Sequence, residues 1–510
     1  MKAVTYRTRH GNASRFDHKR MQLSNSFYGL LCSLSFGIGQ LCLLTGYYTH
    51  SFVVESVLHS AHDRDTNRID AHAGYYGQAI MYGFYTFANL FSPCCLNYMS
   101  SKTVLVLGSA MSTIYLAGFF FINPYFFYPS CIALGIGFAL YYTGHGGYLT
   151  EHSTRETIER NSAVIWGVGT MSMIVGGVIM LFTSKASNAE VADFSYADTN
   201  NTMQTSSYRE YSETEIRYLF GAFAAISLAS NLIFAVLPSA HVENSLADIA
   251  EKTGERTPFR EQMRLMWKAL RHPRVLLLAP LFSFIGVNTS LWISVYPTSL
   301  AFTKSLSHHV YLPALYSIVL GTGDMLMSLL ISVLAKPIPN FGQKPTMVMA
   351  VVLCVATYAM IFATTPPQST RIPTDQPAMF IQPTVSTCLL IAFLFGLSDG
   401  CLMTTRTIMC AIAIPKKRNQ TFAIAKFYQS LLSTIIMFAS PFLSVYVYLV
   451  VLLIGLTLTA VSFFIVAEYT TNETVKMERK VALSAPQAPK PHHIHTMCSI
   501  KKLKVCSTKK

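Results

Sequence analysis

The chain has 510 residues, of which 51% are hydrophobic and only 13% charged, with a formal net charge of +14. A soluble domain uses charged residues for about a quarter of its sequence, and the apolar residues here come in long blocks rather than in amphipathic stripes. The composition therefore excludes an ordinary soluble protein and predicts a chain that crosses a membrane repeatedly.

Twelve apolar segments are long enough to cross a bilayer, because a hydrocarbon core of roughly 30 Å needs about 20 apolar residues in a helix. They lie at residues 24–48, 74–98, 103–122, 125–148, 162–183, 218–237, 274–298, 310–335, 346–364, 386–410, 420–440 and 444–467. The alternating polarity typical of a membrane β-barrel is missing, so the backbone must satisfy its hydrogen bonds within helices. The sequence predicts an all-α membrane protein with twelve transmembrane helices.

The positions of Lys and Arg predict the orientation, because short loops rich in these residues stay in the cytoplasm. With both termini inside, most of the 39 Lys and Arg residues fall in the tails 1–23 and 468–510, the linker 239–273 and the short inner loops. We expect cytoplasmic termini and one six-helix bundle on each side of the linker, at 24–238 and 274–467. The basic inner surface attracts the anionic lipids of a bilayer. We expect no nucleic-acid partner.

The linker contains "RTPFREQMRLMWKALRHPR" (256–274), in which apolar and basic residues alternate at helical spacing. The apolar set is Phe259, Met263, Met266, Trp267 and Leu270, and the basic set is Arg260, Arg264, Lys268 and Arg271. This pattern predicts a basic amphipathic helix on the inner leaflet. A linker helix packed beneath the two halves is an equal alternative.

The two halves resemble each other. "RNSAVIWG" (160–167) opens the fifth span and "RNQTFAIAK" (418–426) opens the eleventh, each with Arg-Asn at the cytoplasmic end. Together with the six-plus-six division, this pattern supports an internally duplicated, transporter-type architecture with pseudo-symmetric halves.

The longest outer loop, 184–217, is acidic and contains the sequon Asn200-Asn201-Thr202. Such a sequon accepts a glycan only on the lumenal or extracellular side. The predicted topology therefore makes Asn200 a glycosylation site.

Five ionisable residues lie inside the predicted spans: His145, Asp324, Asp399, Arg406 and Lys426. A charge at this depth costs at least about 2.5–3.5 kcal/mol, so each needs a partner or a wet cavity. These residues are the candidates for a functional site.

Asp399 lies about eleven residues, or roughly 16 Å, from the inner end of its span, and Lys426 lies roughly 10 Å from the same side. A pair between neighbouring helices is therefore geometrically reasonable. The pair can break and form as a cavity opens, or it can permanently fix helix packing. Asp324 is a competing partner for the lysine.

Arg406 follows Asp399 by seven residues and lies near the inner headgroups, where snorkelling is the common explanation; binding an anionic group or closing an inner gate is the alternative. His145 stands between glycines in "YYTGHGGYL", where it can serve a cavity or pack through hydrogen bonds. Phosphate-binding loops, zinc-protease helices and nucleophile elbows are missing. We expect no enzyme activity, no cofactor and no metal site.

Four blocks resemble signatures of the uncoordinated-93-like family within the major facilitator superfamily, nearest to its orphan branch. They are "GYYGQAIMYGFYTFANLFSP" (74–93), "GIGFALYYTGHGGYLTEHS" (135–153), "GLSDGCLMTTRT" (396–407) and "FAIAKFYQSLLSTIIMFAS" (422–440). The resemblance implies two six-helix bundles around a central cavity. Spans one, four, seven and ten would line this cavity, and spans two, five, eight and eleven would join the halves.

Family members include proposed regulatory subunits of potassium channels, an escort of nucleic-acid-sensing receptors and orphans regarded as solute carriers. Two hypotheses follow for this chain, which we expect in the plasma membrane or an endomembrane. It is a transporter that moves a small solute by alternating access, or it is a regulatory or escort subunit of an ion channel or receptor that transports nothing.

Overall fold

The computed structural model describes residues 25–154, 156–186, 196–197, 203–204, 208–240, 242–252, 259–335, 337–338, 341–414 and 418–484. The chain divides into two units, residues 1–467 and 468–510. The packing described below belongs to the first unit.

The N-terminal half is built from α1 to α7. Its elements are α1 (Asn25–Arg64), α2 (Ala73–Phe91), η1 (Ser92–Asn97), α3 (Ser101–Ala117), η2 (Gly118–Phe121), α4 (Pro124–Glu151), α5 (Ile158–Gly169), α6 (Ser172–Ala186) and α7 (Glu213–Val236). The fifth predicted span is thus interrupted between α5 and α6. Two short antiparallel strands of two residues each, β1 (Tyr196–Ala197) and β2 (Met203–Gln204), lie within the predicted outer loop.

The linker forms α8 (Leu246–Lys252) and α9 (Phe259–Leu270), and the C-terminal half follows. Its elements are α10 (Pro273–Ser290), a π-helical turn η3 (Leu291–Val295), α11 (Tyr296–Ala301), α12 (Lys304–Ser307), α13 (Leu312–Leu334), α14 (Lys344–Thr364), α15 (Val385–Ile412), α16 (Arg418–Ala439), η5 (Ser440–Phe442) and α17 (Val445–Ser484). The seventh span therefore consists of α10, η3 and α11 in succession.

Eleven helices of the described part are long and apolar enough to cross a membrane. The second predicted span, α2, falls outside this set because tyrosines, glycines and Gln78 reduce its hydropathy. It nevertheless packs as a full helix between α4 and α16. The prediction of an all-α membrane fold is confirmed, and α2 occupies the place of a twelfth helix.

The first helix is longer than predicted. The sequence placed its end near residue 48, whereas α1 continues to Arg64. Val53, Val57 and Ala61 recur at helical spacing and are fully buried. Their packing extends the helix beyond the predicted end of the span.

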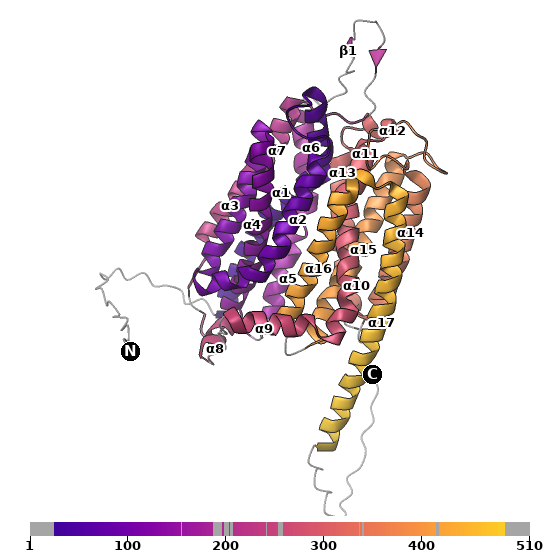
Figure 1. Ribbon diagram of the computed structural model, residues 1–510. Coiled ribbons are helices and arrows are strands. Elements are labelled where there is room, and N and C mark those ends of the chain that lie inside the picture. Colours follow the sequence, from indigo (N-terminus) through magenta and orange to yellow (C-terminus); the bar gives the residue numbers. More distant parts are fainter. Residues whose placement is uncertain are drawn as a thin grey trace, which may run out of the picture. The chain divides into compact units, whose positions relative to one another are not determined.

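Each half packs internally, and a few helices join the halves. Figure 1 shows the indigo-to-magenta helices of the N-terminal half beside the orange and yellow helices of the C-terminal half, with α9 running across one end. The halves meet where α2 packs on α16, where α6 packs on α13, and where α1 contacts η3 and α11. Spans two, five, eight and eleven thus join the halves, as the resemblance implied.

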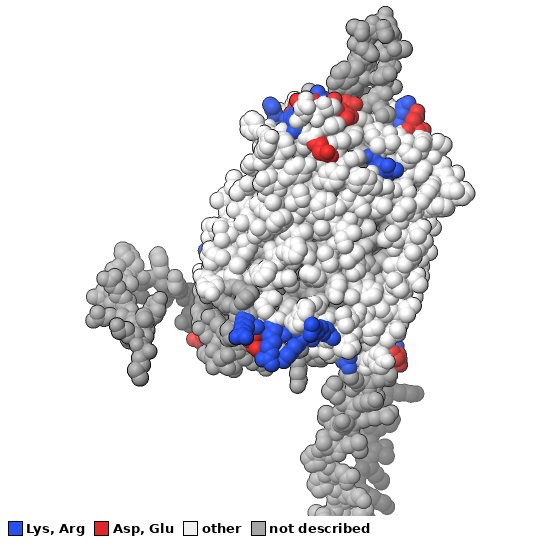
Figure 2. Space-filling view, viewed as in Figure 1, with Lys and Arg blue, Asp and Glu red and all other residues white. Residues whose placement is uncertain are grey.

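The surface between the two ends of the first unit is apolar. Figure 2 shows a broad uncharged surface with charged residues confined to its upper and lower margins. Exposed Leu, Val, Ile and Phe side chains on α3, α7, α13, α14 and α17 contribute to this surface. Such a surface suits the hydrocarbon core of a bilayer. We call the margin with α8 and α9 the linker face and the other the loop face.

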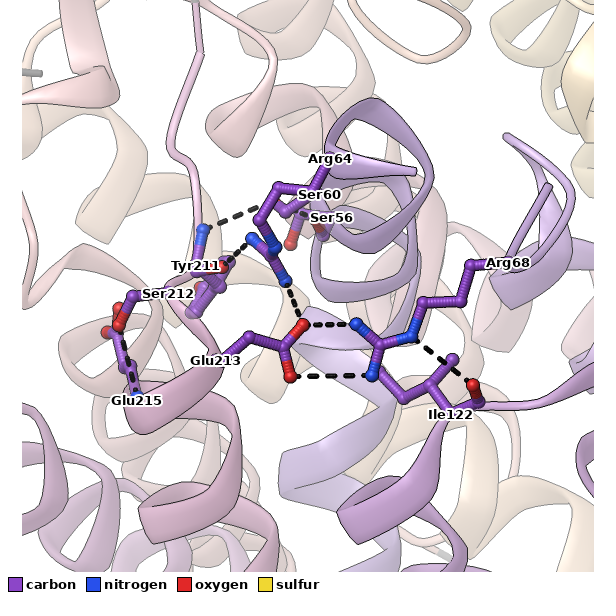
Figure 3. A network of polar contacts seen from close by, with 9 residues as sticks. All are labelled: Ser56, Ser60, Arg64, Arg68, Ile122, Tyr211, Ser212, Glu213 and Glu215. Carbon is purple, nitrogen blue, oxygen red and sulfur yellow. Dashed lines mark hydrogen bonds and ion pairs between the residues drawn. The ribbon is translucent and has the colours of Figure 1, made fainter. Parts of the chain in front are cut away.

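An ionic network stabilises the loop face of the N-terminal half (Figure 3). Glu213, at the start of α7, accepts hydrogen bonds from Arg64 at 3.0 Å and from both terminal nitrogens of Arg68. Arg68 also donates to the carbonyl oxygen of Ile122 at 3.3 Å, and Arg64 donates to that of Tyr211. One carboxylate thereby connects the end of α1, the α1–α2 loop and the start of α7.

Candidate functional site

Helices α13 and α15 approach closely enough for backbone contact, and this contact positions the two buried acids. A Cβ added at Gly396 would lie 2.1 Å from the carbonyl oxygen of Leu320, and one at Gly323 would lie 2.6 Å from that of Phe393. Only glycine fits such a contact, which is typical of small-residue packing between membrane helices. The spacing of Gly396 and Gly400 provides the small-xxx-small pattern on α15.

Asp324 and Asp399 lie side by side across this contact. The Oδ1 atom of Asp324 lies 3.1 Å from the position that a Cβ would occupy at Gly400. Gly400 directly follows Asp399 in the chain. Both side chains are buried, with 9% and 6% exposure. From its span, Asp324 is predicted to compete with Asp399 for Lys426. In the structure it faces α15 instead, because the glycines bring the two helices together.

The hydrogen-bond donor to Asp399 is Trp292, a residue outside the set predicted from the sequence. Its indole Nε1 donates to Oδ1 of Asp399 at 3.2 Å, and its carbonyl oxygen accepts from the Tyr316 hydroxyl at 2.7 Å. Trp292 lies in the π-helical turn η3, and such turns often mark functional sites. The chain has only three tryptophans, and a buried indole N–H needs a hydrogen-bond partner. These two facts could have identified Trp292 from the sequence as a candidate site residue.

Lys426 does not form the expected ion pair with Asp399. Its Nζ lies 5.0 Å from the centre of the Tyr142 ring on α4, in a cation–π contact across the two halves. Neither Asp324 nor Asp399 makes an ion pair within the described part of the chain. The depths of Asp399 and Lys426 along their helices are compatible with an ion pair. In the structure, however, the Lys426 side chain extends from α16 toward Tyr142 of α4.

Arg406 makes a contact between α15 and α16. It is half-buried, and its Nη1 donates to Oε1 of Gln429 on α16 at 2.8 Å. This interhelical bond satisfies part of the guanidinium, and snorkelling of Arg406 to the headgroups stays a prediction. Arg406 and Lys426 therefore place positive charge on the α15–α16 side of the acidic pair.

His145 lies among aromatic rings rather than with the acids. Its ring centre is 4.9 Å from that of Phe36 on α1 and 5.2 Å from that of Trp166 on α5. Its Nδ1 has no hydrogen-bond partner among the described residues. His145 therefore packs among aromatic rings, but the hydrogen bonds that the packing alternative expected are not seen at Nδ1 among the described residues.

Hydrogen bonds between the halves lie toward the loop face and at mid-depth. The Tyr75 hydroxyl, near the loop-face end of α2, donates to the carbonyl oxygen of Thr370 at 2.8 Å. One turn further, Gln78 donates to the Ser294 hydroxyl at 3.0 Å. The Thr86 hydroxyl donates to Ser430 at 2.8 Å, at mid-length of α16. In this conformation hydrogen bonds therefore join the halves both at the loop-face end of α2 and at mid-depth, where Ser317 of α13 also donates to the carbonyl oxygen of Met173 of α6 at 2.7 Å.

The remaining predicted site, Asn200, lies outside the described residues. Its glycosylation stays a prediction.

The family model described as "Ion channel regulatory protein UNC-93" matches residues 65–464. The chain belongs to this family. It is 26% identical over 454 residues to the UNC93-like protein MFSD11 of Xenopus laevis, covering 86% of this chain and 96% of the relative. The same protein of Xenopus tropicalis gives equal figures.

Solved transporter structures share the fold. A POT family transporter in complex with 5-aminolevulinic acid aligns with a TM-score of 0.57 at 11% identity, covering 87% of this chain and 96% of that one. The nucleoside transporter NupG gives 0.54 at 14%, covering 88% and 99%. A D-xylose-proton symporter gives 0.54 at 13%, covering 86% and 96%. This UNC-93 family member is thus a multi-pass membrane protein that shares the fold of these transporters.

Proposed function

We propose that this UNC-93 family member is a transporter that moves a small solute by alternating access. The observation that carries the proposal is the buried acidic pair, Asp324 and Asp399, which lies beside the joint between the halves and makes no ion pair in the described part of the chain. The fold that this chain shares with solved transporter structures also supports the proposal of transport.

A purely structural role accounts poorly for this arrangement. Buried charges that only fix packing are normally paired, because an unpaired buried charge is costly. Here Asp399 accepts a hydrogen bond from Trp292, while Lys426 lies on an aromatic ring of the other half. Acidic and basic side chains are therefore both available to a solute that enters between the halves.

The test uses the variant Asp399→Asn in purified full-length protein. A panel of sugars, amino acids and nucleosides is screened for thermal stabilisation, and each hit is then measured for uptake into proteoliposomes. We expect the parent to be stabilised by its solute and to take it up, and the variant to lose both responses. Asp375→Asn is the matched control, because Asp375 is an exposed acid at the loop face that pairs with Lys304.

Retention of the same solute-dependent stabilisation by Asp399→Asn would contradict the assignment of the acidic pair as the site. A panel in which no solute stabilises the parent, together with proteoliposomes that show no uptake, would count against transport.

A regulatory subunit is the second candidate, favoured by the description of the matching family as ion channel regulators. Co-expression with a potassium channel tests it. A regulator would co-purify with the channel and change its current, whereas a transporter would move solute in channel-free proteoliposomes.

A further inference from the structure

The helix α9 is fixed to the C-terminal half by one of its faces. Ala269 is fully buried in a small cluster with Val275 and Ile424 of α16, and Met266 and Leu270 pack against this cluster. The apolar face is therefore occupied by protein and is not available for insertion between lipid tails. The alternative of a linker helix packed beneath the two halves is met in part, because α9 packs on α10 and α16 of the C-terminal half.

The opposite face of α9 is basic and free. Arg260, Arg264, Lys268 and Arg271 are exposed, and Trp267 has 54% exposure. The Arg271 guanidinium lies 4.4 Å from the centre of the Trp267 ring.

A single acid accompanies this face in the described part of α9. Glu261 forms an exposed ion pair with Arg264 at 3.3 Å, and exposed pairs of this kind are worth little. The net charge of the face is therefore positive.

The position of this face relative to the bilayer is set by the rest of the molecule. Figure 2 shows the basic residues as a row over α9, directly below the uncharged surface that suits lipid tails. Where that surface ends, the lipid headgroups begin. An exposed tryptophan at this level is typical of the membrane interface.

We propose that the exposed face of α9 binds the anionic headgroups of phospholipids in the leaflet at the linker face. Guanidinium and ammonium groups match the phosphate and carboxylate groups of these lipids. Because α9 is held against α16, the backbone that carries these charges is already in place, so little backbone entropy is lost when lipid binds. This surface is separate from the acidic pair, and the inference does not depend on solute transport.

The test measures lipids retained by the full-length protein. The protein in detergent micelles is mixed with equal amounts of phosphatidylserine and phosphatidylcholine, and bound lipids are counted by native mass spectrometry. We expect the parent to retain phosphatidylserine in preference. The double variant Arg264→Gln/Lys268→Gln should reduce this preference by about fivefold for each charge removed.

A matched control removes two exposed basic residues at the loop face, Lys185→Gln/Arg217→Gln. This variant should keep the preference of the parent. Added salt should weaken the preference in the unmodified protein, because exposed charges are screened; this measurement does not depend on the folding of a variant. Equal retention of the two lipids by the parent, an unchanged preference in Arg264→Gln/Lys268→Gln, or an equal loss in both double variants would overturn the proposal.

Discussion

Because α13 and α15 are in backbone contact at Gly396, adding a single methyl group there should lower the stability of the protein strongly. In Gly396→Ala the new Cβ would lie 2.1 Å from the carbonyl oxygen of Leu320, 2.7 Å from the backbone nitrogen of Asp324 and 3.0 Å from the Cα of Gly323, whereas ordinary contact needs 3.4–4 Å. The nearest atoms belong to the backbone, so the helices must separate by more than about 1 Å. Overpacking typically costs about 1–3 kcal/mol, and the upper part of this range applies because no side chain can rotate away.

Gly146→Ala is the control for this prediction. Gly146 lies within α4, and a Cβ at this position meets nothing within 4 Å. Alanine has the higher helix propensity by about 1 kcal/mol, so this variant should be unchanged or slightly more stable.

Heating purified protein and measuring the fraction that stays monodisperse in size-exclusion chromatography compares the two variants directly. Equal thermal stability of Gly396→Ala and Gly146→Ala would refute the backbone contact between α13 and α15.

Three further changes test other contacts of the described residues. Trp292→Phe removes the donor to Asp399 and should lower the free energy of unfolding by about 1–3 kcal/mol. In a double-mutant cycle with Asp399→Asn the two effects should be non-additive; additive effects would show that the two side chains are not hydrogen-bonded. Burial lowers the pKa of His72, but the hydrogen bond and charge of Glu55 outweigh it, so the net pKa lies above the usual 6.5. The stabilisation from protonated His72 is therefore complete below about pH 6.5 and lost as pH rises through the raised pKa, and His72→Gln should flatten the dependence of melting temperature on pH in this range. Glu213→Gln weakens the network of Figure 3 and should lower stability by about 1 kcal/mol, whereas an unchanged melting temperature would show that the network contributes nothing.

The sequence predicted the membrane spans well because the thickness of the bilayer fixes the length of each apolar segment. The end of α1 was missed for a physical reason. The first predicted span ends at residue 48, before the polar residue Glu55, yet Glu55 is almost fully buried and accepts a hydrogen bond from the backbone nitrogen of Tyr75 at 2.8 Å. A polar residue satisfied by a distant part of the chain looks the same in sequence as one exposed to water.

The candidate site was predicted only as a set of residues. The cost of an intramembrane charge identified Asp399, Arg406 and Lys426, but it could not say which groups they contact. Asp399 and Arg406 are seven residues apart on one helix, yet the first contacts Trp292 and the second contacts Gln429. Partners depend on the rotation of neighbouring helices, and the π-helical turn at Trp292 changes that rotation without an obvious sequence pattern.

The contacts of the acidic pair and of the lysine differ in a way that bears on how the two halves can move. Asp324 and Asp399 are held within one half by the backbone contact of α13 with α15. Lys426 instead contacts Tyr142 of the other half. If one half rocks against the other, as alternating access requires, the acids move together as one body while the contact of Lys426 with Tyr142 must change. Of the acids and the lysine, the lysine is therefore the group whose contact spans the two halves, and rocking would change that contact together with the hydrogen bonds of Tyr75, Gln78 and Thr86 to the C-terminal half.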